Sequence, residues 1–281
     1  MHAKILVCIL FLHLSSPAFA ESYKLAVYPS NDPAKLIVPM KLLAEYLSQE
    51  SGDQFVAIVT KDYAELSERL RNKSIQLAWI NPINYIKMKS ETPSLKYVAT
   101  YMEKNNDTGQ IIPYYESFII SLKTSNIKTI HDAKDKRFAF TDPGSTSGYA
   151  FPNMMLSKQG ITPETFFQKI FFLKKHDRVI EALTQGSIDV GAVSDGTYYT
   201  AVKKYGDIYT IIERSEPIPL DPIVATENVP KKKILLYQKV LKSMPANHEF
   251  NLSMKQNLGW NAAGFDVKDD GFYDEMRETL K

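Results

Sequence analysis

Three consecutive hydroxyl residues, Ser145, Thr146 and Ser147, stand where a strand-like run gives way to a helical one. The Asp-Pro-Gly at 142–144 is a turn sequence, so the hydroxyl residues are expected at the N-terminus of the following helix. The first N–H groups of a helix lack partners, and the helix dipole adds partial positive charge there, so such an end can bind anions without lysine or arginine. The sequence therefore predicts an oxyanion site, where Gly148 would let a ligand approach the backbone closely.

This stretch has two other interpretations. Ordinary helix capping is one, because Ser and Thr are favoured N-caps, although capping alone requires only one such residue. A hydrolase elbow is excluded, because the central position of the Gly-x-Ser-x-Gly motif is Thr146 here. No His-Glu-x-x-His motif occurs, and the single cysteine is Cys8. We therefore expect a binding protein with no enzymatic activity, no cofactor and no metal.

The first twenty residues have the pattern of a secretory signal peptide. Lys4 precedes an apolar run at 5–14, and the small-x-small sequence Ala18-Phe19-Ala20 follows. We expect cleavage after Ala20 and export to a bacterial periplasm, because a chain of this length can bury a core without disulfides. The formal net charge of +2 argues against binding to nucleic acid, and we expect a monomer.

Short apolar strands alternate with amphipathic helices in two series along the chain. The expected strands are 24–28, 55–59, 75–80, 137–141, 170–173, 188–194 and 208–213, and the main expected helices are 39–48, 62–71, 147–158, 177–185 and 197–204. An extended run at 114–122 separates the two series. A Pro-rich loop and helices are expected after residue 213. This alternation predicts an α/β protein whose first strands form a parallel sheet.

The two series predict two lobes joined by two hinge strands. We expect residues 21–115 and 216–281 in lobe 1, and residues 116–215, which include the hinge strands, in lobe 2. Ligands of such sheets bind outside the carboxyl ends of the strands, which would face each other here across a cleft.

The segment DPGSTSGYAFP (142–152) resembles the D-P-x-S-T-S-G-x-x-x-P motif of the phosphate, phosphite and phosphonate solute-binding proteins of ABC transporters, the PhnD-like family. Further segments resemble that family in order: LAVYPSNDPAKL (25–36), IQLAWINPINY (75–85), ALTQGSIDVGAVSDGTY (182–198) and GWNAAGFDVKDDGFYDEMRETL (259–280). The resemblance implies a type II periplasmic-binding-protein fold, with a mixed sheet flanked by helices in each lobe. It also implies closure on a small phosphorus oxyanion, which is delivered to an inner-membrane ABC permease.

The resemblance also implies roles for particular residues. Ser145, Thr146 and Ser147 match the residues that hold the phosphorus oxygens, His176 matches a histidine at a helix start, and Asp195 matches an acid that ends the next strand. Tyr28, Tyr85 and Tyr115 match side chains from strand ends that complete the pocket. Each has a plainer alternative: a helix start at His176, a cap or turn at Asp195, and packing for any of sixteen tyrosines.

Asp195 and Asn81 bear on which ligand is chosen. A buried carboxylate repels an anion unless a proton lies between them, so Asp195 would favour oxyanions that carry an O–H over sulfate, which carries none. The family usually has Gly before Pro at the end of the third strand, whereas this chain has Asn81. We expect Asn81 either to contact the ligand or to fill part of the pocket. Trp79, in the middle of that strand, is expected in the core.

A second function is compatible with the same residues. The chain could be the ligand-binding subunit of a membrane sensor, with a different small solute, rather than a transport protein. Permease and ATPase genes beside its own would favour transport, whereas a kinase or cyclase gene would favour sensing.

Overall fold

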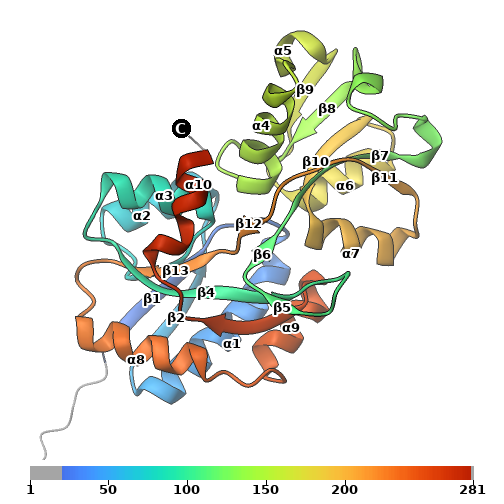
Figure 1. Cartoon of the computed structure of the whole chain (residues 1–281). Coiled ribbons are helices and arrows are strands. Elements are labelled where there is room, and N and C mark those ends of the chain that lie inside the picture. The colour runs from blue at the N-terminus through green and yellow to red at the C-terminus, as the bar shows by residue number, and fades with distance from the viewer. Residues whose placement is uncertain (1–20, 280–281) are drawn as a thin grey trace, which may run out of the picture.

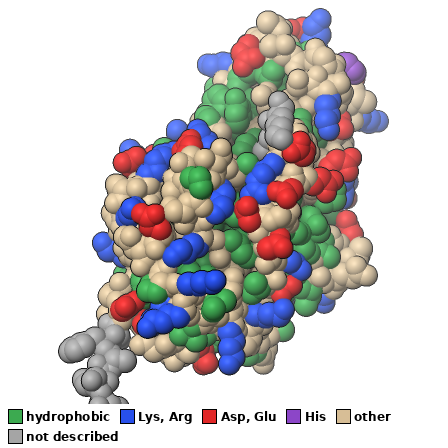
Figure 2. Space-filling model, turned by 60° about the vertical axis from the view of Figure 1, so that its left-hand side comes forward, with side chains coloured by type: hydrophobic (Ala, Val, Ile, Leu, Met, Phe, Trp, Pro, Cys, Tyr) green, Lys and Arg blue, Asp and Glu red, His purple; other side chains and the backbone are tan. Residues whose placement is uncertain are grey.

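The computed structural model describes residues 21–279, so the expected signal peptide and its cleavage site lie outside the described residues. These residues form two α/β lobes, which lie one above the other in Figure 1. Acidic and basic side chains are interspersed on the face drawn in Figure 2. Within the described part of the chain, no helix is long and apolar enough to cross a membrane.

The lower lobe in Figure 1 is built on a seven-stranded mixed sheet. The main strand order is β14 (Ala262–Asp266), β4 (Lys96–Lys104), β13 (Pro222–Ala225), β3 (Leu77–Trp79), β1 (Ser22–Val27) and β2 (Gln54–Val59), and β5 (Ile111–Ile112) pairs with β4. Its helices are α1 (Pro33–Ser51), α2 (Tyr63–Arg71), α3 (Pro82–Glu91), α8 (Lys231–Lys242), α9 (Glu249–Leu258) and α10 (Asp274–Thr279). β1 pairs in parallel with both β2 and β3, which confirms the predicted parallel arrangement of the first three strands.

The expectation of only a loop and helices after residue 213 is wrong. β13 and β14 lie in this stretch, and both pair with β4. β13 is four residues long and begins with Pro222, and β14 contains Gly264 at a φ of +84° with a shift of register beside it. Proline and glycine are poor strand formers, so tertiary pairing rather than local propensity makes these strands.

The upper lobe has a five-stranded sheet in the order β11 (Tyr209–Arg214), β7 (Ser117–Leu122), β10 (Val190–Ser194), β8 (Arg137–Phe140) and β9 (Lys169–Phe172). Its helices are α4 (Phe151–Lys158), α5 (Pro163–Phe166), α6 (His176–Thr184) and α7 (Asp195–Tyr205). Apolar clusters pack against the sheets of both lobes. Trp79, which was expected in the core, is buried in a cluster of the lower lobe.

Two short strands carry the chain between the lobes (Figure 1). β6 (Tyr114–Tyr115) pairs with β12 (Ile218–Pro219), so the extended run expected at 114–122 is interrupted at Glu116, between β6 and β7. An apolar cluster that includes Phe151 and Met276 joins α4 to α10 nearby. The residue limits that the sequence assigned to the two lobes stay a prediction, because β6 and β12 belong to neither large sheet.

The joint between β8 and α4 differs from the expected α-helix at 147–158. The chain first makes a π-helical turn over Thr146–Ala150, capped by Ser145, before α4 begins at Phe151. The Thr141 N–H donates to the Gly148 carbonyl at 3.0 Å, which brings the end of β8 against this turn. A Cβ on Gly148 would lie 1.9 Å from Thr141 Oγ1, so glycine is required by packing within the lobe rather than by a ligand.

We expect Gly148→Ala to lower the free energy of unfolding by about 1–3 kcal/mol, because the added methyl group overpacks a buried joint. Thr141→Ala removes the nearest clashing atom, and Thr141 Oγ1 has no hydrogen-bond partner to lose. The double variant is therefore expected to be more stable than the sum of the two single changes implies, as measured by urea denaturation. Strictly additive losses would contradict this account of Gly148.

Candidate functional site

A cavity of about 50 Å³ lies between the lobes, beyond the carboxyl ends of β1, β3, β8 and β10. The predicted site residues that line it are Tyr28, Asn81, Tyr115, Ser145, Thr146, Ser147, His176 and Asp195. Tyr85 and Gly148 are the predicted site residues that do not line it. Both lobes contribute to the wall, so the cavity exists only when the lobes are together.

Backbone N–H groups orient the hydroxyl groups of the predicted oxyanion site. Ser145 Oγ accepts a hydrogen bond from the Gly148 N–H at 3.0 Å, and Thr146 Oγ1 accepts one from the Ile83 N–H at 3.3 Å. A hydroxyl that accepts in this way still has its own hydrogen to donate. Neither bond uses the hydroxyl hydrogens, so Thr146 can donate to an acceptor in the cavity, and Ser145 can donate either to such an acceptor or to the Tyr63 hydroxyl.

His176 lies in this wall as a neutral side chain. It is 4% exposed, and burial lowers its pKa to about 4. Its Nδ1 accepts a hydrogen bond from the Ser194 N–H at 3.1 Å, so the ring proton resides on Nε2, which lies 3.4 Å from Ser145 Oγ. His176 can therefore donate a hydrogen bond to a ligand without adding positive charge.

Three carboxyl groups, those of Asp195, Asp221 and Glu103, face the same cavity. Burial raises the pKa of Asp195 to about 7, against the opposing effect of the Gly196 N–H that donates to it. Burial likewise raises the pKa of Asp221 to about 7, although the Tyr28 hydroxyl donates to that carboxyl group. Burial, and then the neighbouring charge of Asp195, raises the pKa of Glu103 to about 8. No lysine or arginine stands among the residues that line the cavity.

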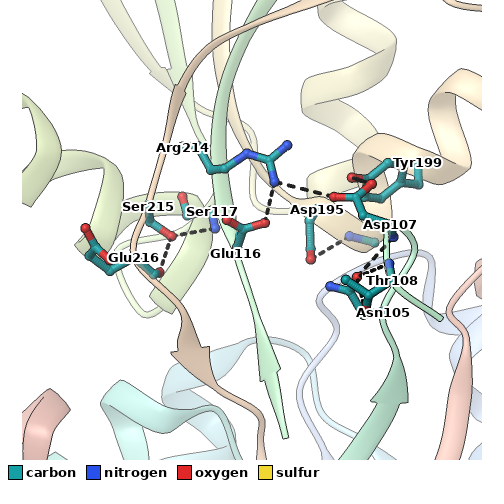
Figure 3. Close-up of polar contacts among 11 residues, drawn as sticks. Asn105, Asp107, Thr108, Glu116, Ser117, Asp195, Tyr199, Arg214, Ser215 and Glu216 are labelled. Carbon is teal, nitrogen blue, oxygen red and sulfur yellow. Dashed lines mark hydrogen bonds and ion pairs between the residues drawn. The ribbon is translucent and has the colours of Figure 1, made fainter. Parts of the chain in front are cut away.

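The guanidinium group of Arg214 lies near Asp195 but is bound elsewhere (Figure 3). Arg214 donates to the Glu116 carboxylate at 2.8 Å and lies 3.7 Å from Asp107, which also accepts a hydrogen bond from Tyr199. The Asp195 N–H donates to the Glu116 carbonyl at 3.0 Å, which ties the cavity wall to this ion pair. The positive charge of Arg214 is thus committed to two carboxylates outside the cavity.

Sequence reasoning missed an aromatic part of the wall. Trp79 Nε1 and Trp260 Nε1 are buried without a hydrogen-bond partner, and both residues line the cavity together with Tyr101. The other lining residues that were missed are Ser30, Tyr63, Glu103, Ser194, Gly196, Leu220 and Asp221. For Tyr101 and Glu103 a signal existed, because residues two apart on one strand point to the same face.

Tyr85 and Asn81 have local roles that the resemblance did not indicate. Tyr85 is fully buried, and its hydroxyl donates to Asp270 at 2.5 Å, so it is a core residue of the first lobe. Asn81 caps α3 through its Oδ1, which accepts from the Asn84 N–H at 3.1 Å. Its Nδ2 donates to the Gly144 carbonyl of the other lobe at 2.7 Å.

Comparison with known proteins identifies relatives of this chain. A family model described as ABC transporter, phosphonate, periplasmic substrate-binding protein matches residues 25–270. The phosphate-import protein PhnD of Mycolicibacterium smegmatis is 24% identical over 69% of this chain and 61% of that protein. A probable phosphite-binding PhnD1 of Prochlorococcus marinus is 24% identical over 69% of this chain and 66% of that protein. The chain thus matches less than two thirds of the length of these two relatives.

Solved structures share the fold. PhnD1 of Prochlorococcus marinus in complex with methylphosphonate has a TM-score of 0.79 and 19% identity, over 92% of this chain and 97% of that chain. A binding protein component of a phosphonate ABC transporter from Pseudomonas aeruginosa has a TM-score of 0.78 and 21% identity, over 92% of this chain and 85% of that chain. These likenesses confirm the predicted two-lobed α/β fold. Because the family model spans most of the described residues, the chain belongs to the family of periplasmic substrate-binding proteins of phosphonate ABC transporters.

Proposed function

We propose that this protein captures a small phosphorus oxyanion (a phosphonate, phosphite or phosphate) in the cavity between its lobes and delivers it to an ABC permease of the inner membrane. The observation that carries the proposal is the pair of hydroxyl groups of Ser145 and Thr146, whose oxygens already accept backbone N–H groups and whose hydrogens remain to be donated. Neutral His176 is a third donor at the same place. The protein acts as a monomer in the periplasm after cleavage at Ala20, and it binds its ligand without catalysis.

The charges around the cavity narrow the choice of oxyanion. At neutral pH the Glu103 carboxyl group holds its proton, whereas the carboxyl groups of Asp195 and Asp221, each with a pKa of about 7, are partly charged. No cationic side chain lines the cavity to balance them. A fully deprotonated anion would be repelled, because an unpaired buried carboxylate is costly. A monoanion of phosphite or of a phosphonate brings an O–H that one carboxylate can accept, and an aminoalkylphosphonate also brings an ammonium group. These ligands are therefore expected to bind more tightly than sulfate.

A role in sensing is the alternative function. The tetrathionate sensor histidine kinase TtrS of Salmonella typhimurium is 21% identical over 72% of this chain and 34% of that protein. This relative supports the alternative that the chain reports a ligand to a membrane kinase instead of supplying a permease. Neighbouring genes for a permease and an ATPase would favour transport.

The experiment that tests the proposed function is a thermal-shift screen supported by native mass spectrometry. The panel contains phosphate, phosphite, methylphosphonate, 2-aminoethylphosphonate and sulfate. A true ligand present at 100 times its Kd stabilises the fold by about 2.7 kcal/mol. Stabilisation by sulfate alone, or by none of the phosphorus oxyanions, would refute the proposal.

We expect Thr146→Ala to weaken binding of the best phosphorus oxyanion by about 1–3 kcal/mol, because a charge-assisted hydrogen bond is lost. Thr146→Ser keeps the hydroxyl group and is expected to retain most of the affinity. Thr165→Ala removes an exposed hydroxyl in the same lobe that bonds only the Thr162 carbonyl, so it is the matched control. Calorimetry measures all three variants, and equal affinities for Thr146→Ala and wild type would mean that Thr146 is only a helix residue.

Asp195→Asn is expected to change the ranking of ligands. The variant no longer repels unprotonated anions, so sulfate gains affinity relative to phosphite and methylphosphonate. Competition calorimetry at one pH gives the ranking for wild type and variant. An unchanged ranking with unchanged affinities would leave Asp195 as a turn residue without a part in selectivity.

The raised carboxyl pKa of Glu103 predicts how stability depends on pH. A carboxyl group whose pKa is near 8 in the folded protein and near 4 when unfolded holds its proton only in the folded state between those values. The unfolded state then binds fewer protons, so the free energy of unfolding falls as pH rises from about 4 to about 8. Glu103→Gln makes this slope shallower by the share of one carboxyl group and leaves the contributions of Asp195 and Asp221, whose pKa values are also raised. The exposed Glu164→Gln leaves the slope unchanged, in urea denaturation at pH 5, 6.5 and 8. If the free energy of unfolding depends on pH equally in wild type and Glu103→Gln, the raised pKa of Glu103 is contradicted.

A further inference from the structure

One carbonyl group of the second lobe accepts two side-chain amides of the first. Asn81 Nδ2 and Asn84 Nδ2 each donate to the Gly144 carbonyl at 2.7 Å. Gly144 lies in the turn between β8 and the hydroxyl residues, whereas both asparagines lie at the N-terminus of α3. These contacts therefore cross from one lobe to the other beside the cavity.

The two amides are held in a donating orientation by their own lobe. Asn81 Oδ1 accepts hydrogen bonds from both the backbone N–H and the Nδ2 of Asn84, at 3.1 and 2.7 Å. A flipped Asn81 would place its oxygen against the Gly144 carbonyl and would lose the helix cap, so the orientation is determined by the network. Asn81 is 2% exposed, which protects these bonds from water.

The accepting turn is equally well defined. The Gly144 N–H donates to Asp142 Oδ1 at 2.9 Å, and the Ser145 N–H donates to the Asp142 carbonyl at 2.8 Å. A Cβ on Gly144 would lie 2.7 Å from Cβ of Tyr63, so only glycine allows the turn to come this close to α2. The turn thus presents its carbonyl to α3 in one fixed position.

Ile83, which precedes Asn84, connects this contact to the oxyanion site. The Ile83 N–H donates to Thr146 Oγ1 at 3.3 Å, and Ile83 belongs to the first turn of α3. The bond occupies a lone pair of the Thr146 hydroxyl, which leaves the hydroxyl hydrogen to a ligand. When the lobes separate, Thr146 loses the group that orients its hydroxyl.

We propose that Asn81, Ile83 and Asn84 form a closure clamp, through which one movement both closes the lobes and aligns the Thr146 hydroxyl with the bound oxyanion. The proposal rests on the proposed function for the nature of the ligand. Asn84 is a positioning residue, because it does not line the cavity and acts only through Gly144 and Asn81. The clamp also explains why Asn81, rather than the glycine usual in the family, precedes Pro82 in this chain.

The test compares Asn84→Ala with a matched control, Asn257→Ala, in the full mature chain. The Asn257 amide bonds the Ser253 carbonyl and Ser253 Oγ within α9, both at 3.0 Å, so its loss disturbs one lobe only. With methylphosphonate as the probe, stopped-flow kinetics of Asn84→Ala are expected to show a dissociation rate about 5–10-fold higher and an association rate near that of wild type. The clamp is overturned if Asn84→Ala dissociates from methylphosphonate at the same rate as Asn257→Ala. It is also overturned if Asn84→Ala changes only the association rate.

A second measurement follows the lobes directly. Residues 21–281 contain no cysteine, so spin labels can be attached to cysteines introduced at the exposed Lys158 and Lys232, one in each lobe. Asn84→Ala is expected to move the distance distribution with methylphosphonate toward longer distances, whereas Asn257→Ala leaves it unchanged. If no ligand of the panel binds wild type, the proposed function fails. The same spin labels then compare wild type with Asn84→Ala in the absence of ligand. Identical distributions for wild type and Asn84→Ala overturn the clamp in either case.

Discussion

The oxyanion site depends on two backbone N–H groups that donate to hydroxyl oxygens. One comes from Gly148, in the same turn as Ser145, and is present whatever the lobes do. The other comes from Ile83, in the opposite lobe, and reaches Thr146 only when the lobes meet. One of these two N–H groups is therefore built into one lobe and the other is supplied by contact between the lobes, so the oxyanion site is fully oriented only when the lobes meet.

The same arrangement explains how an anion could be held where no cation faces it. His176 is kept neutral by burial, and Arg214 is bound to Glu116 and Asp107 outside the cavity. Hydroxyl, imidazole and indole groups supply donors without net charge, and the carboxyl groups supply acceptors. Such a wall distinguishes ligands by where their hydrogens are rather than by their total charge, because each unmatched buried donor or acceptor costs free energy.

The sequence indicated those parts of the site that follow recognisable strands. The hydroxyl triplet, His176 and Asp195 all stand at the end of an apolar run, and all line the cavity. Glu103 was not predicted because no strand was expected at β4, so its alternation with Tyr101 was not recognised. Asp221 was not predicted because β13 begins with the next residue, a proline, and no local pattern marks that strand. Tyr85 matched the family by position, but the first turn of α3 directs it into the core. The π-helical turn at Thr146 likewise has no sequence pattern, since the pairing of Thr141 with Gly148 produces it.

The contact between Asp107 and the second lobe differs in kind from the buried amides of α3. Asp107 lies in the hairpin between β4 and β5, and its side chain and that of Arg214 are about half exposed, at 56% and 42%. Exposed charges are screened by dissolved ions within about 8–10 Å at 0.1–0.15 M salt, whereas the buried amide contacts are not. In a compartment whose ionic strength follows the surrounding medium, one point of lobe contact would weaken as salinity rises while the other stays constant.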